Sequence, residues 1–322
     1  FFNQRLTGSF DYYYKKTNDI LVHTPYIAAM GEGGEPWVNG ASMNNQGVEF
    51  TVSFKSDPSS EFQWAVSANI GTYKTELTDL PSNVINKYAG DGVHDLILGR
   101  SPNSAYGLVA DGIFKTQEEV DAHADQPGKA VGRIRYKDLD GDGVINETYD
   151  RTWIGCYDPD FFGGLNFDFA YKGFDLNLFF EGMFGNDVNS DWKKESDIWL
   201  FTNPAWKNHA TRMLGGWSPD NPNSDIPAIS NNTANQEQRF SSWFIEDGSY
   251  IKLRNIELGY TFPTKLIKKM HMSNLRLYAA AYNVFTLKKF WGDDKYTSFD
   301  PERPSYHYLT PFTFNFGINV SF

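Results

Sequence analysis

The sequence has a single cysteine among 322 residues, Cys156, so no disulfide can form within the chain. A small secreted scaffold held together by disulfides is therefore excluded. Long apolar runs are missing as well: none approaches the roughly 20 residues that a membrane-spanning helix needs. This excludes a chain built from membrane-spanning helices, although hydrophobic residues make up 40% of the sequence.

Positive charge is also scarce. Lys and Arg total 29 against 40 Asp and Glu, which gives a formal net charge of −11. Nucleic-acid binding needs clustered Lys and Arg to contact phosphates, so no nucleic-acid partner is expected. The sequence has no Ser/His/Asp set, HExxH motif, phosphate-binding loop or dinucleotide fingerprint, and we therefore expect no enzyme.

The first residues of the chain lack the features of a signal peptide. Residues 1–5 show neither a basic segment nor an apolar segment with a cleavage site. They lead directly into a strand-like pattern. Either a signal peptide has been removed or the chain is a fragment of a longer protein, and the second interpretation is favoured.

Aromatic residues are abundant, at 16% of the sequence. Many of them alternate with polar residues, as side chains do on the two faces of a β-strand. The last segment shows this most clearly, where small or polar residues separate the apolar positions Phe312, Phe314, Phe316, Ile318, Val320 and Phe322. The same alternation recurs in residues 5–14, 48–55, 62–70, 161–172, 175–181, 251–262 and 275–285.

These segments predict about eight strands of roughly 10 residues each, the length of a strand in a transmembrane barrel. Two are irregular: Ile251 and Leu253 fall on the other parity from Ile256, and 275–285 fits either register. On the polar parity of the two central segments, the residues expected to face a lumen are Phe162, Asn166, Asp168, Asp175, Asn177 and Glu181. Those expected to face lipid are Phe167, Phe169, Leu176 and Leu178.

The connections between the segments alternate between short and long. The short ones are residues 56–61, 171–174 and 263–274, and the long ones are 18–44, 75–160, 187–247 and 287–310. Short turns at one end and long loops at the other are typical of outer-membrane β-barrels, whose long loops are extracellular. A soluble β-sandwich would also alternate, but it does not require this sorting of loops. The aromatic C-terminal residue, Phe322, resembles the signal read by outer-membrane barrel assembly machinery.

Several motifs together resemble the SusC/RagA family of TonB-dependent transporters. They are Tyr106–Phe114 (YGLVADGIF), Arg133–Asn146 (RIRYKDLDGDGVIN), Tyr171–Leu176 (YKGFDL), Trp217–Pro222 (WSPDNP), Asp247–Thr261, Leu275–Thr286 and Asp300–Glu302. The match runs in order over nearly the whole chain. Lys115, where the family often has Gln, and a longer spacer at 290–300 depart from the family pattern.

The resemblance implies that residues 1–322 are the C-terminal part, about eight strands, of an antiparallel 22-stranded barrel with a plug in its lumen. Such a protein lies in the lipid of the bacterial outer membrane, here with its C-terminus on the periplasmic side. The family imports oligosaccharides or, in some members, peptides under a SusD-like surface lipoprotein. The TonB–ExbB–ExbD system drives this import through the N-terminal region, which this chain does not include.

An Asp-rich segment offers a candidate metal site. Asp138, Asp140 and Asp142, with the Val144 carbonyl, occupy the first ligand positions of an EF-hand-type calcium loop. The position of the usual closing Glu holds Tyr149, so Asp150 or Glu147 would complete a structural Ca²⁺ site. The alternative is an Asp- and Gly-rich turn without an ion.

Tryptophans in the long loops are candidate substrate-binding residues: Trp199, Trp217 and Trp243. Their rings can stack on sugars or anchor a partner, or they can simply pack the loops together. Two further functions stay open at this point. One is a complete small outer-membrane barrel acting as an adhesin, an enzyme or a glycan-binding protein, in which the first and last strands would pair. The other is a soluble sugar-binding sandwich.

Overall fold

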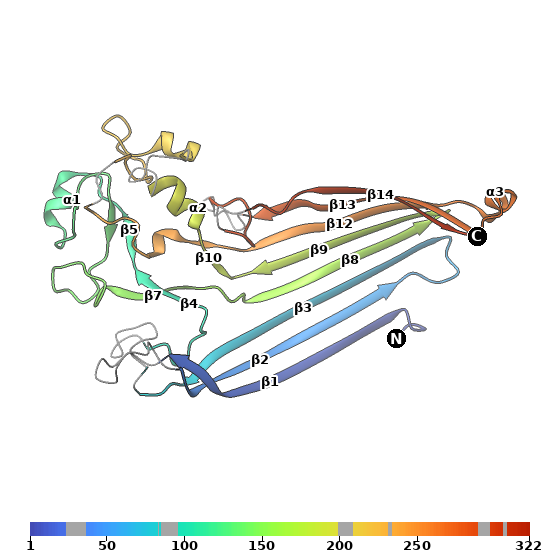
Figure 1. The fold of residues 1–322 in the computed structure, drawn as a ribbon, viewed down its shortest axis with the longest axis horizontal. Coiled ribbons are helices and arrows are strands. Elements are labelled where there is room, and N and C mark those ends of the chain that lie inside the picture. The colour runs from blue at the N-terminus through green and yellow to red at the C-terminus, as the bar shows by residue number, and fades with distance from the viewer. Residues whose placement is uncertain are drawn as a thin grey trace.

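The computed structural model describes residues 1–23, 37–82, 84, 96–198, 209–230, 234–288, 297–304 and 308–322. Eight long strands form one sheet in the order β1-β2-β3-β8-β9-β12-β13-β14, with every neighbouring pair antiparallel (Figure 1). Their bounds are β1 Leu6–His23, β2 Trp37–Lys55, β3 Phe62–Asp79, β8 Phe161–Tyr171, β9 Phe174–Phe184, β12 Tyr250–Thr261, β13 Asn274–Lys288 and β14 Thr313–Ser321. The number of strands and their antiparallel arrangement confirm the sequence-based prediction.

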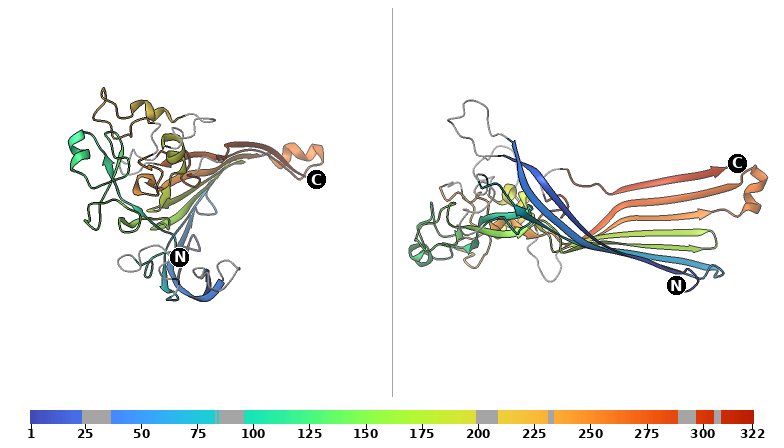
Figure 2. Two further views of the ribbon diagram at one scale, coloured as in Figure 1. Left: turned by 60° about the vertical axis from the view of Figure 1, so that its left-hand side comes forward. Right: turned by 90° about the horizontal axis from the view of Figure 1, so that it is seen from below.

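The sheet is curved and open. Strands β1 and β14 lie at its two opposite edges and do not pair with each other (Figure 2). A closed eight-stranded barrel would need that pairing.

One face of the sheet carries the polar residues and is called the polar face below. In β8 and β9, the Asn177 side chain donates hydrogen bonds to Asn166 Oδ1 at 2.9 Å and to Asp168 Oδ1 at 2.7 Å. Asp175 and Glu181 share the parity of Asn177, and Phe162 shares that of Asp168. The expected grouping of these six residues on one face is confirmed.

The opposite face, called the apolar face below, is lined with rings and aliphatic side chains. Phe167 lies opposite Leu178, and Phe169 lies opposite Leu176. Phe169 stacks on Phe62 of β3 with ring centroids 6.1 Å apart. Which residues share this face is therefore also confirmed.

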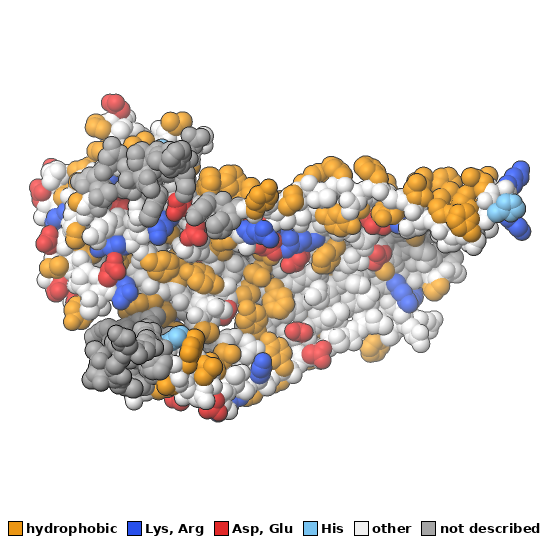
Figure 3. Space-filling view, in the orientation of Figure 1, with side chains coloured by type: hydrophobic (Ala, Val, Ile, Leu, Met, Phe, Trp, Pro, Cys, Tyr) orange, Lys and Arg blue, Asp and Glu red, His pale blue; other side chains and the backbone are white. Residues whose placement is uncertain are grey.

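The apolar face is largely exposed at the edges of the sheet. Phe10 on β1 is 67% exposed and Phe316 on β14 is 82% exposed. Figure 3 shows hydrophobic side chains gathered along β13 and β14. A soluble sandwich would cover such a surface with a second sheet, whereas a barrel wall turns it to lipid. Within the described residues, no helix has the length and hydropathy to cross a membrane.

A β-bulge explains the change of parity within segment 251–262. The register of β12 shifts between Leu253 and Asn255, so the extra residue Arg254 lets both Leu253 and Ile256 face the apolar side. Opposite it, β13 takes an extra residue at Asn283, whose φ of 54° lies in the left-handed region. The period of two therefore breaks at Arg254 in β12. In β13 it continues, because Ala281 pairs with Ile256 and Phe285 with Leu253 on one parity. Segment 275–285 fits two registers because apolar residues occupy both of its parities.

The short turns lie at one end of the sheet. Lys172 and Gly173 connect β8 to β9 with φ of 47° and 86°, the two positive angles of a type I′ hairpin turn. The connection from β12 to β13 holds the short helix α3 (Thr264–Ile267) and a 3₁₀ turn, Lys268–Met270. Both chain ends lie at this end of the sheet in Figure 1.

The first three strands are longer than expected. β1 reaches His23, β2 begins at Trp37 and β3 ends at Asp79, so the predicted loops 18–44 and 75–160 start too early and 18–44 ends too late. Alternation between apolar and polar residues ends before the strands do: Lys74 and Glu76 form a 2.6 Å ion pair on the parity that is apolar lower in β3. Above that level the strands are stabilised by a local core of Val22, Ala41, Leu77, Leu80, Val84 and Ile97.

The described parts of the long connections 80–160 and 185–249 fold together into a structure called the lobe below (Figures 1 and 2). Its strands are β4 Ser104–Leu108, β5 Ala110–Ile113, β6 Ile134–Tyr136, β7 Arg151–Cys156, β10 Asp187–Asn189 and β11 Ile245–Asp247. Its helices are α1 Gln117–Ala122 and α2 Asp191–Lys193, with a π-helical turn at Lys194–Ile198 and 3₁₀ turns at Thr211–Gly215 and Ser242–Phe244. Both connections contribute to one buried core: Leu108, Ile113, Ile134, Tyr136, Ile145, Ile198 and Phe244.

The assignment of the two faces leads to a first testable prediction. In the full-length protein in lipid vesicles, Leu178→Lys places a charge on the apolar face and should destabilise the barrel by about 2–4 kcal/mol. Asn177→Lys, one residue earlier on the polar face, is the matched control and should cost far less. Equal losses in denaturant unfolding for the two variants would contradict the assignment of lipid and lumen sides.

Candidate functional site

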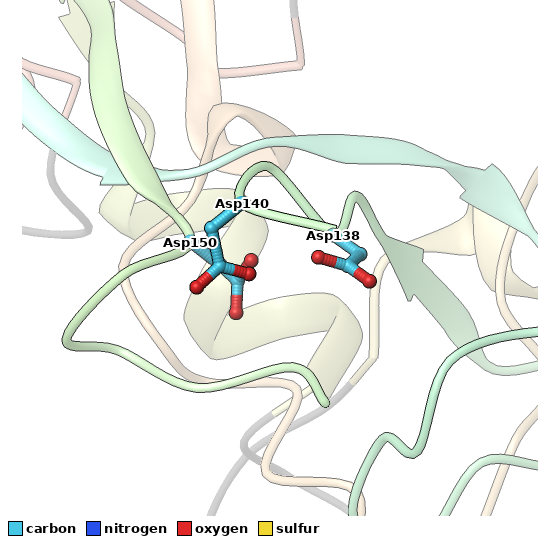
Figure 4. A group of neighbouring side chains, drawn as sticks. All are labelled: Asp138, Asp140 and Asp150. Atoms are coloured by element: carbon cyan, nitrogen blue, oxygen red, sulfur yellow. The ribbon is translucent and has the colours of Figure 1, made fainter. Parts of the chain in front are cut away.

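The Asp-rich segment forms a compact loop, residues 138–150, between β6 and β7. Carboxylate oxygens of Asp138, Asp140 and Asp150 all lie within 4.8 Å of one another (Figure 4). Asp150 is fully buried, Asp138 is half-buried and Asp140 is exposed. The structure therefore brings together three of the residues that the sequence nominated.

Backbone donors hold two of these carboxylates in place. Asp138 accepts hydrogen bonds from the N–H groups of Gly141 at 2.7 Å and Gly143 at 2.9 Å. Asp150 accepts from the N–H groups of Leu139 at 2.8 Å and Asn146 at 2.7 Å. The loop can curl around Asp138 because Gly141 and Gly143 have φ of 76° and 84°, which glycine adopts readily.

The electrostatics of the cluster differ from one carboxylate to the next. Burial opposes ionisation of Asp138, but the N–H groups of Gly143 and Gly141 outweigh it and lower its pKa. For Asp140, the N–H of Asp142 stabilises the anion, yet burial and the charges of Asp142 and Asp150 raise the pKa overall. Three carboxylates this close repel one another, and a bound cation would remove that repulsion.

Two nominated residues lie differently. Asp142 is outside the group of three, and its carboxylate accepts from the N–H of Val144 at 2.7 Å. The carbonyl of Val144 accepts from the Asn146 side chain at 3.4 Å. Asp150, one residue beyond the usual closing position, lies inside the group.

Two of the three candidate tryptophans lie against the lobe core. Trp217 and Trp243 are half-buried and pack on that core. The ammonium of Lys193 lies 4.7 Å from the Trp243 ring centroid. Trp243 also lines a cavity of about 480 Å³ in the lobe, together with Lys193 and Glu246. Trp199 lies outside the described residues.

A charged cluster at the lobe end of β12 was not found from the sequence. Lys252, 3% exposed, pairs with Asp300 at 2.6 Å and also contacts Glu302. Arg254 pairs with Glu181 at 2.7 Å and with Glu302. We call this cluster the clasp, since it joins segment 297–304 to the sheet. Figure 3 shows positive and negative side chains gathered over this end of β12. The only sequence signal was that four of its members lie in two family-like motifs far apart in the chain: Lys252 and Arg254 in one, Asp300 and Glu302 in the other.

A second charged group lies nearer the turns on the polar face. Arg276 of β13 pairs with Asp175 of β9 and with Glu257 of β12, the latter at 2.7 Å. The guanidinium neutralises both carboxylates. This pairing suits residues that line a polar wall better than residues that transfer protons in acid–base catalysis.

Comparisons with known proteins agree with this architecture. No protein-family model matches the chain. The chain is 30% identical over its full length to TonB-dependent receptor P3 of Formosa agariphila, of which it covers 33%, and 26% identical over its full length to TonB-dependent receptor SusC of Bacteroides thetaiotaomicron, of which it covers 31%. The chain thus spans about a third of the length of the curated relatives it matches.

A solved structure shows the same fold. A chain in the structure of the RagAB peptide transporter matches all of this chain with a TM-score of 0.76 at 24% identity, and 34% of that chain is covered. The eight-stranded sheet therefore has the fold of part of an outer-membrane transporter barrel. The resemblance to the SusC/RagA family, recognised from motifs, is confirmed along the whole chain.

The clasp gives a prediction about pH. Partial burial opposes ionisation of Glu302, but hydrogen bonds from Arg254 and Lys252 outweigh it and lower its pKa to about 2. A depressed pKa stabilises the folded state above the ordinary pKa of 4.5, and this stabilisation is lost as pH falls towards 2. Glu302→Gln should therefore speed proteolysis of segment 297–304 at pH 7, with the difference from wild type shrinking below pH 4.5.

An acid-stable protease such as pepsin is needed at the low-pH end, with trypsin-like cleavage used at neutral pH. The control is Glu147→Gln, which removes one carboxylate elsewhere in the lobe. A difference between wild type and Glu302→Gln that is the same at pH 7 and pH 2.5 would contradict the role given to ionised Glu302.

Proposed function

We propose that the chain forms barrel wall and outer lobe in a TonB-dependent outer-membrane importer. The support is that its whole length is similar to about a third of the length of TonB-dependent receptor P3 and of TonB-dependent receptor SusC. The observation that carries this is the two-faced sheet. Its apolar face is exposed at Phe10 and Phe316, while its polar face holds hydrogen-bonded and ion-paired groups such as Arg276. A wall between lipid and a wet lumen needs both faces.

The finer assignments are proposals as well. The substrate is an oligosaccharide or a peptide, the surface partner is a SusD-like lipoprotein above the lobe, and the TonB–ExbB–ExbD system supplies energy through parts of the protein outside this chain. The chain acts in transport and not in catalysis, which fits the pairing of Asp175 and Glu257 with Arg276. We place the C-terminus on the periplasmic side because β14 ends beside the short turns (Figure 1).

The alternative of a complete small barrel acting as an adhesin or glycan-binding protein finds less support. It would require β1 to pair with β14, and these strands lie at opposite edges of the sheet.

Energised uptake tests the proposal. Cells that depend on the full-length protein should accumulate labelled oligosaccharides or peptides only when the TonB system is intact. Deletion of the TonB protein should abolish accumulation while leaving the barrel assembled in the outer membrane. Accumulation at the same rate without the TonB protein would contradict import of this kind.

We also propose that the Asp138–Asp150 loop holds a structural Ca²⁺. Convergence of Asp138, Asp140 and Asp150 supports this, because Ca²⁺ prefers carboxylate and carbonyl oxygens. The loop is tied to the lobe by backbone bonds from Asp125 N–H to Gly143 at 2.7 Å and from Ile145 N–H to Asp125 at 2.9 Å. An ion there would therefore stabilise the lobe through the buried Ile145.

Calcium content and lobe stability check this proposal. The intact protein should retain about one Ca²⁺ after desalting, and chelation should speed cleavage within the loop. Asp140→Asn should lower both calcium content and protection. Asp220→Asn, which makes the same charge change at an exposed residue elsewhere in the lobe, should preserve them. Unchanged calcium content and protection in Asp140→Asn would leave the loop as a turn without an ion.

A further inference from the structure

A cavity of about 600 Å³ is lined by residues from the lobe ends of β9 and β12, from strand β10 and from segment 301–304. Figure 1 shows that these three strands come together where the lobe meets the sheet. Its size is within the range of sites for small ligands. Tyr157 and Tyr250 form part of the lining, with Met183, Pro301 and Pro304 as apolar surface. Met183 shares the parity of Glu181, so the cavity opens at the level of the polar face.

The polar lining of this cavity consists largely of acceptors. Asp187, Asp191 and Glu302 contribute carboxylates, and no Lys or Arg is among the described residues that line it. Glu302 is neutralised from behind by Lys252 and Arg254. Asp187 and Asp191 have no such partner among the ion pairs of the described residues, which leaves the cavity with an excess of negative charge.

The side chain of Asn186 independently indicates a ligand that donates hydrogen bonds. It lines the cavity, is only 6% exposed, and its Oδ1 has no hydrogen-bond partner among the described residues. A buried acceptor without a donor costs free energy, so such atoms are rare unless they have a function. This oxygen, like the nearby carboxylates, would be satisfied by a donor on a ligand.

The electrostatic potential in the cavity also favours a cation. Burial raises the pKa of Asp187, and the neighbouring charges of Asp247 and Asp160 raise it further, although the Cys156 N–H donates to its Oδ2 at 2.7 Å. Burial, followed by the charges of Asp187 and Asp191, raises the pKa of Tyr157. The cavity is thus a region of negative potential, partly shielded from water, where a positive group gains most.

We propose that this cavity binds the ammonium group of a peptide substrate, with Asp187, Asp191 and Asn186 accepting its hydrogen bonds and Met183 and the prolines contacting its aliphatic part. The proposal rests on the proposed function, since it names the substrate class of the importer. A neutral sugar could donate to the same oxygens, but it would leave the negative charge uncompensated. An ammonium satisfies both the acceptors and the charge.

Binding of defined peptides to the intact purified protein tests this inference. The probes are a short peptide with capped ends and one Lys, the same peptide with that Lys acetylated, and an uncapped version in which the only ammonium is the N-terminus. We expect the two ammonium-bearing peptides to bind at least about tenfold more tightly than the acetylated one, because the acetylated peptide has no ammonium to donate charge-assisted hydrogen bonds. This comparison uses the wild-type protein and needs no variant to fold.

The double variant Asp187→Asn/Asp191→Asn should reduce that preference to near one, and Asp220→Asn, an exposed acid elsewhere in the lobe, should retain it. Equal affinity for the charged and acetylated peptides in wild type would overturn the inference. So would a preference that survives the double variant, or tight binding of a neutral oligosaccharide that the double variant abolishes. These results are separate from transport: charge-selective binding without TonB-dependent uptake would contradict the proposed function alone.

Discussion

The pairing of backbone groups governs this structure. In hydrocarbon no water can satisfy an N–H or C=O group, so each strand must hydrogen-bond to its neighbours along its whole lipid-facing length. That requirement fixes a continuous antiparallel ladder from β1 to β14. Once the ladder is fixed, side chains can only alternate between two faces, and a one-residue slip would exchange lipid-facing and lumen-facing sets. The charges on the polar face then need partners within the wall, as Arg276 finds in Asp175 and Glu257.

The same ladder explains why the lobe exists. The two-residue turn at Lys172 and Gly173 makes β8 and β9 neighbours. At the other end of the sheet, the connection that leads into β8 therefore lies about one strand spacing from the connection that leaves β9. Two long segments that adjoin there can bury a shared core. They are joined by the buried pair Arg133–Glu237 at 3.0 Å, and Glu237 also accepts from the N–H of Ile134 at 2.8 Å. The contact costs desolvation but fixes how the two segments meet.

Periodicity predicted what depends on local sequence. The eight strands and their faces follow from the alternation of apolar and polar residues. The grouping of Asp138, Asp140 and Asp150 follows from the ligand spacing of an EF-hand-type loop. The bulge at Arg254 did not, because a bulge depends on packing across strands and interrupts the period of the sequence. The upper ends of β1, β2 and β3 were missed for a related reason. Beyond the lipid both faces are mixed, and their extension depends on the core around Val22 and Leu77.

The clasp and the cavity were beyond the reach of the sequence because each joins residues from distant segments. Lys252 meets Asp300 only because β12 and the segment before β14 converge where the sheet leaves the lipid. At that level the surroundings of the chain change from hydrocarbon to water. In hydrocarbon the backbone must form regular strands, whereas in water it can form irregular loops. Polar side chains can be partly buried there without being placed in hydrocarbon. Binding residues such as Asn186 and Asp187 therefore gather at the junction, where rigid strands position them and loops give access.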